Sequence, residues 1–269
     1  MITKGKVFII TGASSGIGAE LANQLAKKGA MIVCAARTLK KLEAICTEIN
    51  KNGGSAIPVQ VDITDKAQCD KMVEKTIQSY NKIDGLVLNA GISMWAKFDE
   101  IKDISFFKTI MNTNYLGSIY CVHSALPYLK ESKGKIISCS TAQAIMGFPN
   151  HSGYVASKHA LHGFLSTIRM ENKNEITILE AVLSWIKGTN LRRNSFGAEG
   201  EKKQDGSVRK HTNESVSLHQ CVKIIIQSIE KDLKTVYIPK KLSLIPFLKV
   251  FFNGFLERKV SKAISKNKK

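Results

Sequence analysis

The 269-residue chain lacks any run of about 20 apolar residues, the length that a transmembrane helix needs. Its six cysteines are scattered and none forms a Cys-x-x-Cys pair, so the sequence supports neither a zinc site nor a redox motif. We therefore expect no metal and a reducing compartment. There is no internal repeat and no low-complexity linker. The N-terminus leads straight into a predicted strand without the apolar region of a signal peptide, which predicts a cytoplasmic protein.

Acidic side chains are scarce, with 22 against 40 lysines and arginines and a formal net charge of +18. The excess is uneven: residues 1–185 carry 21 basic and 15 acidic side chains, whereas residues 186–269 carry 19 and 7. A basic C-terminal third would attract anionic lipid, phosphorylated substrates or nucleic acid. Because no nucleic-acid motif accompanies the charge, we expect no nucleic-acid partner.

Short apolar runs alternate with amphipathic stretches over the first two thirds of the chain. Helical patterns cover Ile17–Lys28, Leu39–Asn52 and Ala67–Asn81. Apolar strands separated by helices predict an α/β fold, a single Rossmann-type doubly wound domain whose mainly seven-stranded parallel sheet is flanked by helices. The predicted strands are Val7–Ile10, Met31–Ala36, Ala56–Val61, Leu86–Leu88, Ile136–Cys139, Ile176–Val182 and Val236–Ile238.

Tyr154 and Lys158 lie four residues apart in the segment Gly-Tyr-Val-Ala-Ser-Lys. Residues at this spacing share one face of a helix, which places a phenol beside an ammonium. A nearby positive charge favours the phenolate and lowers the pKa of the tyrosine, making it a proton donor or acceptor near neutral pH. Reduction of a carbonyl, or oxidation of an alcohol, by hydride transfer requires such a group.

Two glycine motifs accompany this pair. Thr11-Gly-Ala-Ser-Ser-Gly-Ile-Gly18 follows the first predicted strand and opens a predicted helix, and Asn89-Ala-Gly91 follows the fourth strand. Glycines in such a turn let a pyrophosphate approach the backbone, while the helix N-terminus supplies amide donors and a positive dipole. Together with Asn114, these motifs resemble the short-chain dehydrogenase/reductase family over about residues 4–191, and within it the lipid and hydroxysteroid reductases.

The resemblance implies a catalytic set. Tyr154 is its acid/base, Lys158 tunes the phenol and bonds the nicotinamide ribose, and Asn114 holds a water of the proton relay. The hydroxyl that orients the substrate carbonyl remains open between two neighbours. Thr141 lies at the family's usual spacing before the tyrosine and is favoured, and a shift of the loop by one residue would give the role to Ser140.

The resemblance also implies a nicotinamide dinucleotide. Arg37 follows the second strand, where an NAD-specific enzyme would carry an acid, and a guanidinium suits a 2′-phosphate, so we predict NADP(H) rather than NAD(H). Asp62 resembles the acid that contacts adenine, with capping of a helix near Thr64 as its alternative role. The predicted cofactor-binding residues are Gly12, Ser14, Ser15, Gly16, Ile17, Gly18, Arg37, Asp62, Ile63, Asn89, Ala90, Gly91, Tyr154, Lys158, Ile186 and Thr189.

One loop departs from the family pattern. Leu183-Ser184 stands where similar enzymes carry Pro-Gly. The backbone here therefore lacks the fixed φ of proline and the conformational freedom of glycine. Further on, a polar, glycine-containing stretch lies where the family's fold covers the substrate, so the resemblance implies a substrate lid over about residues 190–216. The apolar walls of the substrate site are expected from Met94, Trp95, Ile145–Phe148, Trp185 and Phe196.

The segment Leu242–Leu256 is apolar and aromatic, and a basic tail, Arg258–Lys269, follows it. Two interpretations stay open: an element packed on the core or on another subunit, and an interfacial anchor to an anionic membrane. The predicted organisation is thus a dehydrogenase domain over residues 1–241 and an apolar, basic C-terminal extension over residues 242–269. The resemblance implies a homodimer or homotetramer.

The predicted function is transfer of hydride between NADP(H) and a ketone or alcohol, with an apolar or lipid-like carbonyl as the substrate. The alternative is a non-catalytic dinucleotide-binding scaffold on the same fold. That alternative rests on the altered Pro-Gly pair and on Thr141 at the serine position, and the presence of Tyr154, Lys158 and Asn114 speaks against it.

Overall fold

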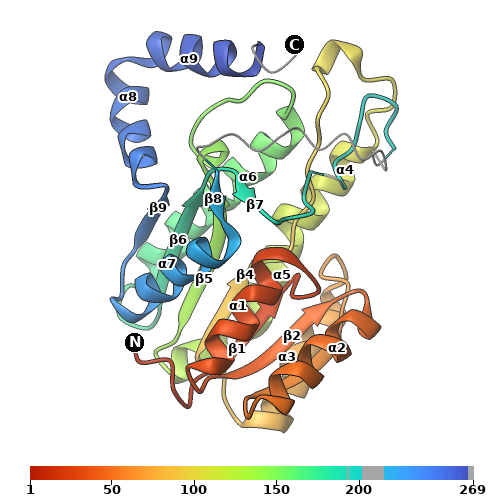
Figure 1. Ribbon diagram of the computed structural model, residues 1–269, viewed down its shortest axis with the longest axis vertical. Helices are drawn as coiled ribbons and strands as arrows, with labels where there is room; N and C mark the ends of the chain where they lie inside the picture. The colour runs from red at the N-terminus through yellow and green to blue at the C-terminus, as the bar shows by residue number, and fades with distance from the viewer. Residues whose placement is uncertain (193, 202–214, 266–269) are drawn as a thin grey trace.

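A computed structural model provides the structure, which describes residues 1–192, 194–201 and 215–265. One parallel sheet runs through the molecule, with the strand order β3-β2-β1-β4-β5-β6-β9 (Figure 1). The predicted seven-stranded parallel sheet is therefore confirmed. Its strands are β1 (Val7–Thr11), β2 (Met31–Ala36), β3 (Ser55–Gln60), β4 (Gly85–Leu88), β5 (Lys135–Thr141), β6 (Thr177–Leu183) and β9 (Thr235–Ile238).

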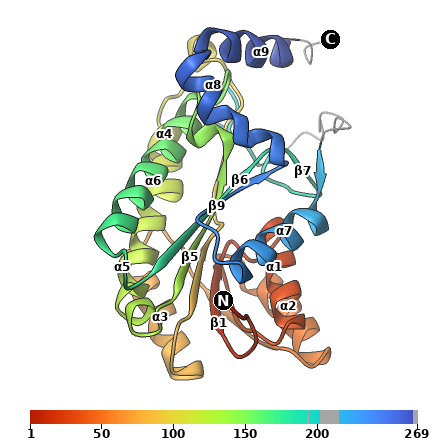
Figure 2. The ribbon, with the colours of Figure 1, turned by 90° about the vertical axis from the view of Figure 1, so that its left-hand side faces the viewer.

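Helices cover both faces of the sheet (Figure 2). One face packs under α1 (Gly16–Lys27), α2 (Leu39–Lys51) and α7 (Leu218–Glu230). The other packs under α3 (Lys66–Tyr80), α5 (Gly117–Glu131) and α6 (Ser152–Glu171). Because strand side chains alternate between two buried faces, the strands read in the sequence as continuous apolar runs.

Parallel strands bring their carboxyl ends to one edge of the sheet. The order reverses between β1 and β4, since β1 is followed by β2 on one side and β4 lies on the other. Such a reversal opens a crevice between the loops that leave the two strands, and ligands of open α/β sheets bind there. The glycine motif after β1 and the Asn89-Ala-Gly91 turn after β4 meet at this point.

The side chain of Asn89 joins the ends of β1 and β4. Its Nδ2 donates to the carbonyl oxygens of Thr11 at 3.0 Å and Gly12 at 3.2 Å. The Thr11 hydroxyl completes the link, accepting from the Asn89 backbone N–H at 3.0 Å and donating to the Val87 carbonyl at 2.9 Å. These bonds satisfy backbone groups that the strand ends leave unpaired.

Two glycines allow this close approach. Gly12 has a φ of +65°, and a Cβ there would lie 2.9 Å from the Cα of Ala90. A Cβ on Gly18 would lie 2.5 Å from the Gly12 carbonyl oxygen and 2.6 Å from Nδ2 of Asn89. Gly18 therefore lets the first turn of α1 pack against the Asn89 link.

Further elements lie outside the seven-stranded sheet and its six flanking helices. The short helix α4 (Phe106–Met111) follows the loop after β4. A two-stranded sheet, absent from the sequence prediction, pairs β7 (Ile186–Lys187) with β8 (Val216–Ser217). Beyond β9, the chain forms a 3₁₀ turn (Lys240–Leu244) and then α8 (Ile245–Phe251) and α9 (Asn253–Ser265), which extend past the end of the sheet (Figure 1). Within the described ranges, no helix combines the length and the apolar character needed to cross a bilayer.

Replacement of Gly18 by alanine is expected to lower the free energy of unfolding by about 1–3 kcal/mol, because the new methyl group forces apart the Gly12 carbonyl and the Asn89 amide. Gly163→Ala is the matched control, since Gly163 lies on α6 with nothing within 4 Å of its Cβ position. Helix propensity predicts that the control is neutral or stabilising. Equal denaturant midpoints for both variants would contradict the packing assigned to Gly18.

Candidate active site

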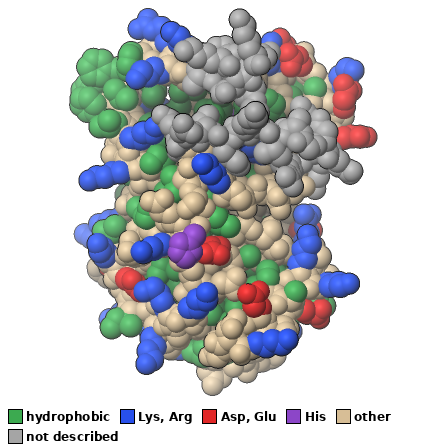
Figure 3. Space-filling model, in the orientation of Figure 1, with side chains coloured by type: hydrophobic (Ala, Val, Ile, Leu, Met, Phe, Trp, Pro, Cys, Tyr) green, Lys and Arg blue, Asp and Glu red, His purple; other side chains and the backbone are tan. Residues whose placement is uncertain are grey.

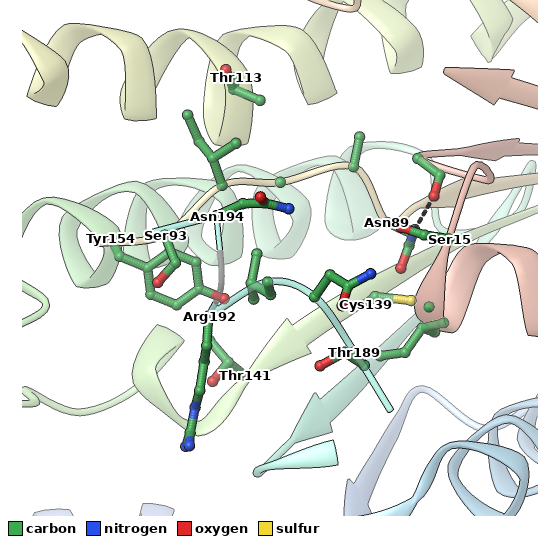
Figure 4. A pocket seen from close by; sticks show the side chains of 18 of the residues that line it. Ser15, Asn89, Ser93, Thr113, Cys139, Thr141, Tyr154, Thr189, Arg192 and Asn194 are labelled. Carbon is green, nitrogen blue, oxygen red and sulfur yellow. Dashed lines mark hydrogen bonds between the residues drawn. The ribbon is translucent and has the colours of Figure 1, made fainter. Parts of the chain in front are cut away.

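A cavity of about 580 Å³ opens at the carboxyl ends of the strands (Figure 4). Tyr154 and Thr141 lie toward one end, and Ser15 and Asn89 lie toward the other. All of the predicted catalytic and cofactor-binding residues line this cavity except Gly18 and Asn114, which lie behind its wall.

Tyr154 and Lys158 lie on the first two turns of α6 and are almost fully buried, with exposed fractions of 7% and 5%. The Lys158 Nζ is 5.8 Å from the centre of the Tyr154 ring. Burial raises the pKa of the Tyr154 phenol and lowers the pKa of the Lys158 ammonium. The lowered tyrosine pKa expected from the sequence is therefore wrong for this arrangement, because burial of the phenol raises its pKa. The phenol keeps its proton at neutral pH.

Asn114 lies in a π-helical turn, Asn112–Leu116, that precedes α5. Its amide makes three hydrogen bonds: Oδ1 accepts from the Ile92 N–H, and Nδ2 donates to the Ile92 carbonyl and to Oγ of Ser157, each at 2.9 Å. Ser157 in turn donates to the Tyr154 carbonyl at 2.8 Å. Asn114 thus ties the loop after β4 to the turn of α6 that carries Tyr154 and Lys158.

Both candidate hydroxyls lie at the end of β5 and line the cavity. Since side chains alternate along a strand, Thr141 shares its face with Cys139, another lining residue, whereas Ser140 shares its face with the buried Ser138. The Thr141 Oγ1 accepts from the Gln143 N–H at 3.3 Å, which leaves its own proton available to a ligand.

The glycine turn between β1 and α1 presents backbone donors to the cavity. Ser15 is the N-cap residue of α1, but its side chain makes no capping hydrogen bond to the helix. The N-terminal amides and the positive end of the helix dipole therefore remain available to an anion. Thr189 lies against this turn, since a Cβ on Gly16 would be 3.7 Å from its Cγ2.

Comparison with known proteins agrees with this geometry. The profile of the short chain dehydrogenase family matches residues 6–200. The chain belongs to the short-chain dehydrogenase family. It is 38% identical over 199 residues to 11-beta-hydroxysteroid dehydrogenase 1A of Arabidopsis thaliana. The aligned region covers 73% of this chain and 57% of that relative's length.

Two further similarities extend the comparison. The chain is 32% identical over 257 residues to 11-beta-hydroxysteroid dehydrogenase A of Arachis hypogaea, covering 94% of this chain and 74% of the relative. Its fold matches the X-ray structure of an alcohol dehydrogenase from the archaeon Thermococcus sibiricus complexed with 5-hydroxy-NADP, with a TM-score of 0.73 and 20% identity over 86% of this chain and 95% of that one.

Two charged residues line the cavity near the glycine turn. Arg37 is exposed, and within the described part of the chain its side chain forms no ion pair. Asp62 accepts from the Thr64 N–H at 3.0 Å and from the Thr64 hydroxyl at 2.8 Å. The alternative role of Asp62 as a helix cap is wrong, because α3 begins at Lys66 and Asp65 caps it.

The apolar walls predicted from the sequence are mostly wrong. Of those residues, only Trp185 lines the cavity. Met94 and Phe196 instead pack with Phe106 and Tyr154 in a small core of their own, where the rings of Phe106 and Phe196 stack at 5.1 Å. These two residues therefore hold Tyr154 in place from behind, out of contact with the cavity.

Several lining residues had no signal in the sequence, among them Ser93, Thr113, Cys139, Gln143, His151 and Asn194. Among the described residues, Oε1 of Gln143 has no hydrogen-bond partner, although it is buried. For Gln143 and His151, the one signal in the sequence is that they lie close to Thr141 and Tyr154 along the chain. The predicted lid over residues 190–216 lies largely outside the described residues, and its described part contributes Asn190, Leu191, Arg192 and Asn194 to the wall.

Proposed function

We propose that the protein is an NADP(H)-dependent oxidoreductase that interconverts an apolar, lipid-like ketone and its alcohol. The observation that carries the proposal is the buried Tyr154–Lys158 pair in the same cavity as the glycine turn. A phenol that keeps its proton at neutral pH is suited to donate that proton to a carbonyl oxygen. A scaffold that only binds a dinucleotide has no need of such a pair.

The residues present fit a nicotinamide dinucleotide. The cradle at Gly12 has no room for a side chain, and the free N-terminus of α1 offers amide donors to a pyrophosphate. Ile186 and Thr189 would hold the nicotinamide end, with Lys158 at its ribose, as the family resemblance implies. When bound, the nicotinamide supplies or accepts the hydride at the carbonyl carbon.

The chain's own residues handle the proton. Thr141 donates a hydrogen bond that orients the carbonyl oxygen, and Tyr154 transfers its phenolic proton to that oxygen as the carbon is reduced. The ammonium of Lys158 then stabilises the phenolate that remains, until a proton returns from solvent. Asn114 acts as a positioning residue, because its amide links Ile92 to Ser157 beside the pair.

Two features support the finer parts of the proposal. The exposed guanidinium of Arg37 at the end of β2 is suited to a 2′-phosphate, which favours NADP(H). For the substrate, the names of relatives at 32–38% identity refer to hydroxysteroids, which are alcohols on an apolar ring system and give ketones on oxidation. The half-buried indole of Trp185 offers an apolar surface in the cavity.

Tyr154→Phe keeps the ring in its core and removes only the proton. Turnover of a ketone panel with NADPH is expected to fall by roughly 10²- to 10⁴-fold, while the dissociation constant for NADPH stays within a few-fold of the unmodified protein. Unchanged turnover would refute the acid role. Binding of NADPH by the unmodified protein without turnover of any ketone would favour the scaffold.

Arg37→Asp tests the cofactor preference. The change removes the partner of the 2′-phosphate and supplies an acceptor for free ribose hydroxyls, so the ratio of kcat/KM for NADPH over NADH is expected to fall by about ten-fold or more. Lys40→Asp, an exposed position on the neighbouring α2, is the matched charge control and should leave the ratio unchanged. If both changes lowered the ratio equally, the preference for NADPH would come from the overall positive charge of the protein rather than from Arg37.

Thr141→Val preserves the shape of the side chain and deletes its hydroxyl. If Thr141 orients the carbonyl, kcat is expected to fall by roughly 10²- to 10³-fold, whereas Ser140→Ala should cost only a few-fold. Steady-state kinetics of the two variants with one ketone decide between them. The reverse ranking would move the orienting role to Ser140.

A further inference from the structure

The two C-terminal helices present a cluster of large apolar side chains to solvent. We define the α8 patch as Leu244, Phe247, Val250, Phe251, Phe252 and Phe255, whose exposed fractions run from 45% for Phe255 to 74% for Val250. Figure 3 shows apolar side chains gathered at the upper left, where α8 lies in Figure 1. Single exposed apolar residues are common on protein surfaces, but a contiguous aromatic group marks an interaction site.

The patch is not a loose end of the chain. On their inner side, α8 and α9 bury Ile245 and Leu256 against Met146, in the loop that follows β5. On the outer side, the Phe247 ring packs on Phe251 at 4.9 Å and on Phe252 at 6.0 Å. The helices are therefore seated on the core through one face, and the rings of the opposite face support one another in solvent.

The charged residues around the patch are nearly all of one sign. Between residues 240 and 262 there are six lysines and arginines and a single acid, Glu257. The Nζ of Lys259 lies 5.0 Å from the centre of the Phe255 ring, so charge and aromatic surface are intermixed. The six basic residues, all exposed, are Lys240, Lys241, Lys249, Arg258, Lys259 and Lys262.

We propose that the α8 patch docks on the surface of an anionic lipid bilayer. Aromatic side chains enter the boundary between headgroups and acyl chains, while the surrounding lysines and arginines contact anionic headgroups. A second copy of the chain fits this face less well, because pairing through it brings two basic rims together. The apolar side chains of this patch lie at the rim of the molecule (Figure 3), a position that suits a fluid, deformable surface.

Docking of this kind also sets the orientation of the enzyme. Met146 forms one cluster with Ile245 of α8 and Leu256 of α9, and its neighbours Ala142 and Phe148 pack against this cluster. This loop directly follows Thr141 at the end of the cavity. The bilayer would therefore lie at the same end of the sheet as the proposed active site. The proposal itself does not depend on catalysis, so a failure of the proposed activity leaves it open to its own test.

Co-sedimentation of the full chain with vesicles tests the proposal. We expect binding to vesicles of phosphatidylcholine mixed with phosphatidylserine, weaker binding to phosphatidylcholine alone, and weakening of the former by added salt. The double change Phe251→Ser and Phe252→Ser should lower the partition coefficient by about ten-fold or more. Met170→Ser, at a residue 72% exposed near the far end of α6, is the matched control and should have no effect.

Two charge-reversing double variants test the role of the basic residues. Arg258→Glu with Lys259→Glu should weaken binding to the anionic vesicles, whereas the control, Lys40→Glu with Lys41→Glu on α2, should not. Circular dichroism of each variant checks that the fold is kept. The proposal is wrong if the folded protein does not sediment with anionic vesicles, or if the serine variant binds them as well as the unmodified chain. Dissociation of an oligomer by the serine change, without vesicle binding, would assign the patch to a second copy.

Discussion

The amide of Asn89 connects the two strands between which the site is built. It binds the carbonyls of Thr11 and Gly12 and so holds the end of β1 beside the end of β4, where the strand order reverses. The link requires that Gly18 carry no side chain, since a Cβ would meet both the amide and the Gly12 carbonyl. The proposed phosphate-binding end of the cavity depends on this contact, because it fixes the start of α1 beside the glycine turn.

The proton end of the cavity depends on a different constraint, the burial of two ionisable groups. Tyr154 and Lys158 are both held out of water, and each is thereby pushed toward its neutral form. The Asn114–Ser157 bonds and the stacked Phe106 and Phe196 rings leave α6 little freedom to relieve this burial. We infer that the phenol is kept as an acid until a carbonyl arrives, and that the ammonium then becomes useful as a partner for the phenolate.

The sheet could be predicted because its strands are buried on both faces, so that runs such as Val7–Ile10 and Met31–Ala36 are apolar throughout. The glycine turn and the Tyr154–Lys158 pair could also be predicted, since each motif is local in the chain. The sequence does not predict which residues lie behind the cavity wall. Whether Asn114, Met94 or Phe196 faces a ligand or supports a neighbour depends on contacts between distant segments. The direction of the Tyr154 pKa shift could not be predicted for the same reason. The spacing reveals the charge four residues away, but it does not reveal the burial that raises the pKa.

The central claim is that the protein transfers a hydride between a nicotinamide and a carbonyl carbon while Tyr154 supplies the proton. The most direct measurement incubates the protein with a ketone panel and NADPH deuterated at C4 of the nicotinamide, followed by mass spectrometry of the alcohols. The account predicts that one of the two C4-deuterated epimers of NADPH places deuterium on the carbinol carbon of at least one alcohol product. The hydroxyl oxygen of that alcohol should carry no deuterium. Tight binding of NADPH with no deuterium in any product would contradict it.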